Sequence, residues 1–316
     1  MKKLKFLKIY FIFCILFLIF FFYKYKSLKI IKLVNKKNSD IKVCICTSGK
    51  KENRYIREFV EYYKKYGIDK IILYDNNDFD GERFEDVIND YIENGFVKLF
   101  NRRGKKREQL KILNHCYINN FKKFDWLIFY DLDEYIYLKN YTNIKDFLKL
   151  KKFEGCQTIS LNWVYHTDNN LIYYKNKTLH ERFPKKYEDK NNTKCLYPIK
   201  SILKGHIPNI KINCLHKLNS KLKRCNGFGI KPKMFTYLMQ PDFQYYYIDH
   251  YYFKSLEEFI EKLNKGSAIS YDNYKIKETI LIRYFIMNDI NINKLNYIEN
   301  KTHMNITLFK KYGLKE

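Results

Sequence analysis

Between residues 41 and 130 the sequence alternates between short apolar runs and segments with helical spacing. The apolar runs cover residues 41–46, 69–74, 97–100 and 125–130, and the helical segments cover 54–66, 82–93 and 107–123. Strands separated by helices of this length form a mostly parallel sheet with helices on both faces. We therefore predict an α/β fold of the Rossmann-like kind.

Polar side chains directly follow three of these apolar runs. Thr47 follows the first run, Asp75 and Asn76 follow the second, and the acidic cluster Asp131–Glu134 follows the fourth. In parallel sheets, ligands bind beyond the carboxyl ends of the strands. Because these ends share one edge of the sheet, we predict a ligand site there that all three clusters help to build.

Asp131 and Asp133 are the residues best suited to hold a metal ion. They are two residues apart, so an extended chain would place both carboxylates on one side. A hard divalent cation prefers carboxylate oxygens and keeps positions open for substrate phosphates. The ion would neutralise charge that develops on a diphosphate leaving group. A solvated turn is the alternative for so short a pattern, but its position after a buried strand favours a reaction centre.

The second half of the chain has a less regular pattern. A helix over 255–265 is its clearest signal, because Ser255 and Glu258 fit a capping box and Gly266 can end the helix. The other expected elements are strands over 157–164, 201–204 and 210–215, with loops over 166–197.

The N-terminal region contains a long uncharged apolar run. Residues 9–23 carry no charge, and the stems of Lys8 and Lys24 can lengthen the span. No small-x-small cleavage site follows, which favours an uncleaved transmembrane helix over a signal peptide. Lysines on both sides leave the orientation open. The expected division is a basic tail (1–8), the anchor (9–23), a basic stem (24–40), a globular domain (41–266) and a C-terminal helical extension (267–316).

The charge balance is strongly basic. Sixty Lys and Arg residues against 34 Asp and Glu residues give a net charge of +26. A basic surface favours anionic partners, which here are membrane lipid, nucleic acid or a phosphorylated substrate. A drift of the whole composition toward Lys is the alternative. The basic residues are scattered and form no recognised nucleic-acid module, so we expect no nucleic-acid partner.

The cysteines and the glycosylation sequons leave the cellular compartment open. The chain has eight Cys and no C-x-x-C pair, so it carries no zinc signature and does not indicate a disulfide framework. Cys44 and Cys46 fit ordinary core positions on one strand face. Asn-x-Ser/Thr sequons would suit a lumenal domain, although a chain so rich in Asn contains several by chance. They begin at Asn140, Asn176, Asn191, Asn300 and Asn305.

The ordered set of motifs resembles one family of sugar-transferring enzymes. WLIFYDLDEYI is similar to the metal-binding stretch of GT-A glycosyltransferases, and the chain more narrowly resembles glycosyltransferase family 92 and its bacterial relatives in family 2. IILYDNNDFDG, REQLKILNHCY, HERF, IKSIL and CLHK are similar to blocks of the family in the same order. IDHYYFKSLEEFIEKLNKG is similar to its signature HY-x-x-KS-x-E-x-F-x-x-K. LNWVYHTDNN departs from the family by placing His166, Thr167 and Asp168 where small residues are expected.

The resemblance implies a GT-A fold and a metal-assisted, inverting glycosyltransferase. Such an enzyme would move a sugar from a nucleotide-sugar donor, here a UDP-sugar, to a hydroxyl group of a glycan or glycoconjugate. Mn²⁺ or Mg²⁺ is the implied cofactor. The residues implied near the donor are Thr47, Asp75, Asn76 and Asp131, with Arg182 and Lys200 available to offset diphosphate charge.

The resemblance also implies a set of metal ligands. Asp131 and Asp133 would hold the ion, His216 would add a late ligand, and His250 competes with His216 for that role. Glu134 would orient its neighbours or close the donor site.

An inverting transfer needs a carboxylate base that deprotonates the acceptor hydroxyl. Asp168 and Glu181 are the candidates by position. Competing functions are a membrane-associated basic protein that binds nucleic acid, a metal-dependent phosphohydrolase that uses the same aspartates, and a degenerate glycosyltransferase that acts as a scaffold. The expected location is a membrane with a single N-terminal span. The domain would face the Golgi or ER lumen in a eukaryote and the cytoplasmic face of the inner membrane in a bacterium.

Overall fold

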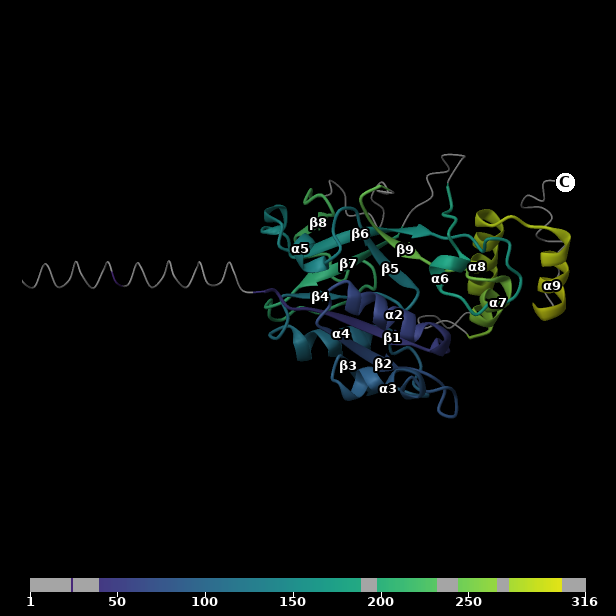
Figure 1. The fold of residues 1–316 in the computed structure, drawn as a ribbon, viewed down its shortest axis with the longest axis horizontal. Helices are drawn as coiled ribbons and strands as arrows, with labels where there is room; N and C mark the ends of the chain where they lie inside the picture. The colour runs from purple at the N-terminus through teal and green to yellow at the C-terminus, as the bar shows by residue number, and fades with distance from the viewer. Residues whose placement is uncertain (1–23, 25–39, 189–197, 232–243, 266–272, 303–316) are drawn as a thin grey trace, which may run out of the picture. The chain divides into compact units, whose positions relative to one another are not determined.

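A nine-stranded sheet organises the part of the chain that the structure describes, which is residues 24, 40–188, 198–231, 244–265 and 273–302 (Figure 1). The computed structural model divides the chain into two units, 1–41 and 42–316, and every described strand belongs to the second. The predicted anchor over 9–23 lies outside the described residues and stays a prediction. Within the described ranges, no helix is both long and apolar enough to cross a membrane.

The first half of the sheet is parallel, as predicted. Its spatial order is β3-β2-β1-β4. The strands are β1 (Val43–Gly49), β2 (Lys70–Asp75), β3 (Val97–Asn101) and β4 (Trp126–Ile128). The helices that connect them are α2 (Asn53–Lys65), α3 (Glu85–Glu93) and α4 (Gln109–Asn120). The alternation of strand and helix is therefore confirmed, with boundaries displaced by a few residues.

The second half of the sheet mixes strand directions, so the whole fold is a mixed α/β fold. The sheet continues from β4 in the order β7-β6-β9-β5, and β8 pairs with β6. β7 runs antiparallel to β4 and β6, β9 runs parallel to β6, and β5 runs antiparallel to β9. These strands are β5 (Glu134–Leu138), β6 (Thr158–Tyr165), β7 (Ile199–Lys204), β8 (Arg224–Asn226) and β9 (Tyr246–His250).

The strand predicted over 210–215 is wrong. This segment forms only an isolated bridge between Cys214 and Leu218. The side chain of Asn114 on α4 takes the backbone hydrogen bonds of Ile212 instead, donating to its carbonyl at 2.8 Å and accepting from its N–H at 2.9 Å. Ile210, Ile212 and Leu215 pack against the core cluster that contains residues of α4, so they are buried or partly buried without forming a strand.

The helix predicted over 255–265 is confirmed as α7 (Leu256–Lys265). Its capping box is present, because Glu258 accepts from the Ser255 N–H at 3.0 Å and the Ser255 hydroxyl accepts from the Glu258 N–H at 3.4 Å. The C-terminal helices lie near it, and α7 contacts α9 (Figure 1). The remaining helices are α5 (Ile144–Leu148), α6 (Leu179–Arg182), α8 (Asn273–Met287) and α9 (Ile292–Thr302), of which α6 lies where only loops were predicted.

Both faces of the central strands are covered. Cys44 and Cys46 on β1 point into the apolar cluster that α4 contributes to. Val43 and Ile45 alternate with them and are equally inaccessible to solvent, so the opposite face of the strand is covered as well. A strand buried on both faces is continuously apolar, which explains the runs from which the sheet was predicted.

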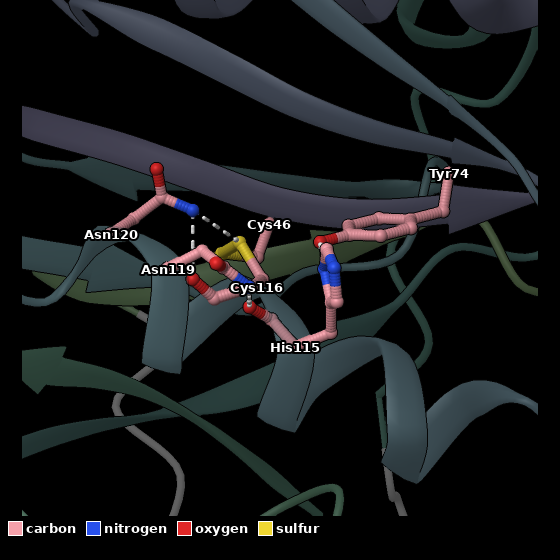
Figure 2. The surroundings of a disulfide bond; sticks show 6 residues. All are labelled: Cys46, Tyr74, His115, Cys116, Asn119 and Asn120. Atoms are coloured by element: carbon pink, nitrogen blue, oxygen red, sulfur yellow. Dashed lines mark hydrogen bonds between the residues drawn. A yellow bond between two sulfur atoms is a disulfide. The ribbon is translucent and has the colours of Figure 1, made fainter.

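Two disulfide bonds correct the expectation that the cysteines form no framework. Cys46 pairs with Cys116, and Cys156 pairs with Cys225. Figure 2 shows Cys46 at its bond to Cys116 on α4. Cys44 stays a free buried core residue, as expected. The partners are 70 and 69 residues apart in the sequence, so only the packing of α4 on β1 and of β8 beside β6 brings them together.

Candidate functional site

The acidic cluster Asp131–Glu134 forms a tight turn between β4 and β5. The Glu134 N–H donates to the Asp131 carbonyl at 3.1 Å, and the Glu134 carboxylate accepts from the Asp131 N–H at 3.0 Å. The chain is therefore not extended here, so the argument that extended geometry places both aspartates on one side is wrong. Leu132 packs so tightly on Gly49 at the end of β1 that a Cβ there would lie 2.4 Å from its Cδ1.

A buried lysine from β7 neutralises the first half of the turn. The Lys200 ammonium lies 2.7 Å from the Asp131 carboxylate and 3.2 Å from that of Glu134, and its side chain is 4% exposed. Burial raises the pKa of Asp131, but Lys200 outweighs burial, so that pKa lies below its usual value. Burial raises the pKa of Glu134 well above its usual value, and the neighbouring aspartates add to this effect.

The second half of the turn faces α7 and β9. The Lys262 ammonium lies 2.9 Å from the Asp133 carboxylate, and His250 Nε2 lies 3.5 Å from it. His250 comes into position because β9 pairs with β5 in a register that sets it opposite Glu134. Burial raises the pKa of Asp133, but Lys262 and His250 outweigh burial, so that pKa lies well below its usual value.

Asp133, Glu134 and His250 together fit a divalent metal ion. One ligand atom from each lies within 4.8 Å of the others, and all three residues are buried. Within the part of the chain that the structure describes, His250 Nδ1 is buried without a hydrogen-bond partner. Burial lowers the pKa of His250, which favours the neutral imidazole that metals bind. Two carboxylates and one imidazole suit Mn²⁺ or Mg²⁺ better than a soft metal.

The predicted metal ligands occupy different places around this turn. The structure groups Asp133 with His250, whereas Asp131 binds Lys200. His216 Nδ1 lies 3.0 Å from the Ile199 carbonyl, and its ring contacts the Trp163 ring, which also contacts His250. Burial, followed by the charge of Lys200, lowers the pKa of His216 to about 4.

Of the residues predicted near the nucleotide, Thr47 shares a small hollow with Asp131 of the acidic turn. Gln109 and Lys200 line the same hollow. The Thr47 hydroxyl is buried and has no hydrogen-bond partner among the described residues, so it is available to a ligand. Gln109 donates to the Asp131 carboxylate at 3.3 Å.

Asp75 and Asn76 brace the loops at the ends of β2 and β3. Asp75 is buried and accepts from Arg103 at 2.9 Å and from the Asn77 N–H at 2.9 Å. The Asn76 amide donates to the Arg102 carbonyl at 2.9 Å. These contacts order the polar edge of the sheet, and both side chains already have protein partners.

A polar cavity of about 450 Å³ lies beside the acidic turn. Lys262 lines this cavity and also binds Asp133, so the cavity adjoins the turn at this side chain. Lys254 and Glu258 line the cavity too. Lys254 binds Glu52 at 2.9 Å, and Glu258 binds Arg182 at 2.6 Å. Other lining residues come from the loops after β1 and β2, from α2 and from α7: Lys51, Arg54, Tyr55, Asn77, Asp78, Gly81, Glu82, Glu261 and Asn264.

Both base candidates have protein partners. Asp168 is buried, lies 2.6 Å from the Lys294 ammonium and accepts a hydrogen bond from Tyr284, which ties it to α8 and α9. Glu181 is exposed and completes the capping box of α6 with Thr178.

The sequence did not predict two features of this site: Glu134 as a possible metal ligand and Lys262 as the cation that binds Asp133. Glu134 lies in the quoted acidic motif, but only the turn reveals that its carboxylate joins Asp133 and His250. Lys262 is the last lysine of the signature quoted from the C-terminal block, and that position was its only signal. In a chain with sixty basic residues, composition could not distinguish it.

Fold and site together define an α/β protein with an acidic cluster and a polar cavity at the carboxyl edge of its sheet. The sequence profile of glycosyltransferase family 92 matches residues 39–283. The match covers most of the chain, which therefore belongs to glycosyltransferase family 92.

Individual relatives match over shorter stretches. A glycosyltransferase family 92 protein of Ricinus communis is 27% identical over 130 residues, which cover 40% of this chain and 22% of that protein. One from Oryza sativa subsp. japonica is 25% identical over 107 residues, which cover 34% of this chain and 18% of that protein. The chain thus spans about a fifth of the length of the curated relatives it matches.

Among solved structures, the similarity to this chain is low. TarS 1–349 of S. aureus in complex with UDP-GlcNAc has a TM-score of 0.38 and 14% identity, with 85% of this chain and 76% of that chain covered. The mannosyltransferase PcManGT of Pyrobaculum calidifontis, in complex with GDP-Man and Mn²⁺, has a TM-score of 0.32 and 11% identity, with 40% of this chain and 36% of that chain covered.

Proposed function

We propose that this protein is a metal-assisted glycosyltransferase with a GT-A active site. It moves a sugar from a nucleotide-sugar donor, a UDP-sugar, to a hydroxyl group of a glycan or glycoconjugate, with inversion at the transferred carbon. The observation that carries this proposal is the buried cluster of Asp133, Glu134 and His250 next to a polar cavity, within a chain that belongs to glycosyltransferase family 92.

Charge gives the cluster its chemical role in this proposal. Asp133 and His250 would hold Mn²⁺ or Mg²⁺ with Glu134 beside them, and the ion would offset the charge on the diphosphate leaving group. Lys200 keeps the carboxylates of Asp131 and Glu134 in place, so the ligands do not need to reorganise when the donor binds.

The hollow at Thr47 and Asp131 has room for about one water molecule (about 10 Å³), and we propose that it marks the point where the nucleotide end of the donor approaches the sheet. Thr47 offers an unpaired buried hydroxyl there, and Gln109 offers an amide. The larger cavity then takes the sugar and the acceptor. Asp168 and Glu181 remain the proposed bases, and each would have to release its present partner to accept a proton.

We also propose a lumenal location behind an N-terminal membrane anchor. Disulfides persist in oxidising compartments, and two are present. The sequon residues Asn140, Asn176 and Asn300 are exposed, as glycan attachment requires, while Asn191 and Asn305 lie outside the described residues.

The decisive experiment measures donor turnover by the full chain in mild detergent. A panel of UDP- and GDP-sugars is supplied with Mn²⁺, with Mg²⁺ and with EDTA, and both released nucleotide and free phosphate are followed. We expect metal-dependent release of nucleoside diphosphate, accelerated by a glycan acceptor. Release of inorganic phosphate without sugar transfer would instead identify a phosphohydrolase.

Asp133→Asn tests the metal cluster directly. The amide keeps the shape of the carboxylate but loses its charge, so we expect turnover to fall on the order of 100-fold in a variant that circular dichroism shows to be folded. Asp146→Asn on α5 is the matched control, because Asp146 is exposed. Full sugar transfer by Asp133→Asn would refute the proposal.

A further inference from the structure

The two lysines that bind the acidic turn have different surroundings. Lys200 is on a central strand, is 4% exposed and lies between the carboxylates of Asp131 and Glu134. Lys262 is on α7, is 29% exposed and lines the cavity of about 450 Å³. Lys200 is therefore a fixed counter-charge, whereas Lys262 has room to move.

Lys262 also has partners that do not depend on Asp133. Its ammonium donates to the Tyr252 carbonyl at 3.1 Å and lies 3.8 Å from the centre of the Tyr252 ring. A desolvated ammonium over an aromatic face is stabilised by the ring. These contacts would keep the side chain at the cavity wall after it left Asp133.

The Lys262 ammonium and a metal ion compete for the same carboxylate. Asp133 offers one oxygen to Lys262 at 2.9 Å and the other to His250 at 3.5 Å. At such distances a divalent ion and an ammonium repel each other strongly, so binding both to the same carboxylate is unfavourable.

We propose that Lys262 is a placeholder cation, which holds Asp133 while the site lacks metal and moves to the donor diphosphate when the metal enters. This inference rests on the proposed function and deepens it. It makes Lys262 a residue that couples metal binding to donor binding. The free protein then binds metal weakly, and the metal binds tightly only together with a diphosphate that attracts the ammonium.

Mn²⁺ binding without any nucleotide tests this role, with the loss of the free Mn²⁺ signal in electron paramagnetic resonance as the readout. The full chain in mild detergent is compared with Lys262→Met. Removing the competing charge should tighten Mn²⁺ binding by about tenfold. Added UDP should tighten Mn²⁺ binding to the wild-type chain much more than to Lys262→Met, because only the wild type has an ammonium to move.

Two further variants control for charge and for folding. Lys262→Arg keeps the charge and should bind Mn²⁺ as the wild type does. Lys145→Met removes a lysine that binds Asp69 at 2.7 Å at the amino ends of β1 and β2, and it should leave Mn²⁺ affinity unchanged. Circular dichroism confirms that each variant is folded.

The outcomes separate the two proposals. Equal or weaker Mn²⁺ binding by Lys262→Met overturns the placeholder role, as does the absence of Mn²⁺ binding in all variants. Tighter Mn²⁺ binding without sugar transfer from any donor supports the placeholder role while the glycosyltransferase proposal fails.

Discussion

Substituting Lys200 should destabilise the fold more than substituting any exposed lysine. Its ammonium compensates two carboxylates at once, Asp131 at 2.7 Å and Glu134 at 3.2 Å, and its side chain is 4% exposed. Lys200→Met keeps most of the side-chain volume but removes the cationic partner of the fully buried Glu134 and of Asp131, whose side chain is 37% exposed. Removal of one member of a buried ion pair costs about 3–5 kcal/mol.

The assay is chemical unfolding of the full chain in mild detergent, without reductant, followed by circular dichroism. Lys111→Met is the matched control, because Lys111 also forms an ion pair, with Glu108, but its side chain is 75% exposed. An exposed pair contributes about 0–1 kcal/mol. We therefore expect the two variants to differ by at least about 2 kcal/mol in the free energy of unfolding.

A second substitution identifies the cause of this loss. Lys200→Met combined with Asp131→Asn removes one charge of each sign, so it should recover part of the lost stability. If Lys200→Met loses no more than Lys111→Met, or if Asp131→Asn worsens it, the electrostatic account of the turn is wrong.

Two other predictions concern pH and the disulfide near the site. Folding lowers the pKa of His216 from 6.5 to about 4, so the unfolded chain binds a proton more readily than the folded one. The free energy of unfolding should therefore be highest above pH 6.5 and fall by up to about 3 kcal/mol as the pH drops toward 4. Acid titration of unfolding should show a flatter profile for His216→Asn, and an unchanged profile would contradict this origin. Replacing Cys46 and Cys116 by Ala opens a loop of 70 residues and should cost about 2–4 kcal/mol in thermal or chemical unfolding. A double variant as stable as the parent would show that this bond adds no stability.

Local patterns in the sequence were enough to predict the parallel half of the fold. The strands β1, β2 and β4 are buried on both faces, so their apolar runs are nearly continuous, whereas β3 at the edge of the sheet is only partly buried. The capping box of Ser255 and Glu258 was recognisable because its partners are three residues apart. The strand expected over 210–215 failed because Asn114, about a hundred residues away, satisfies its backbone.

The position of the acidic cluster at a strand end was likewise predictable from the chain alone, but its partners were not. Those partners are His250 on β9, Lys262 on α7 and Lys200 on β7. These elements come from the second half of the chain and reach the turn only in the folded structure. The disulfide between Cys46 and Cys116 depends in the same way on α4 covering β1. Hydrophobic periodicity, helix caps and polar residues at strand ends depend on residues that are close in the chain. The sequence alone therefore determined the helices and strands of the parallel half and the sheet edge that carries the site. The ion pairs of the acidic turn and the disulfides join residues many tens of positions apart, so only the tertiary structure decided which histidine and which lysines lie against the acidic turn.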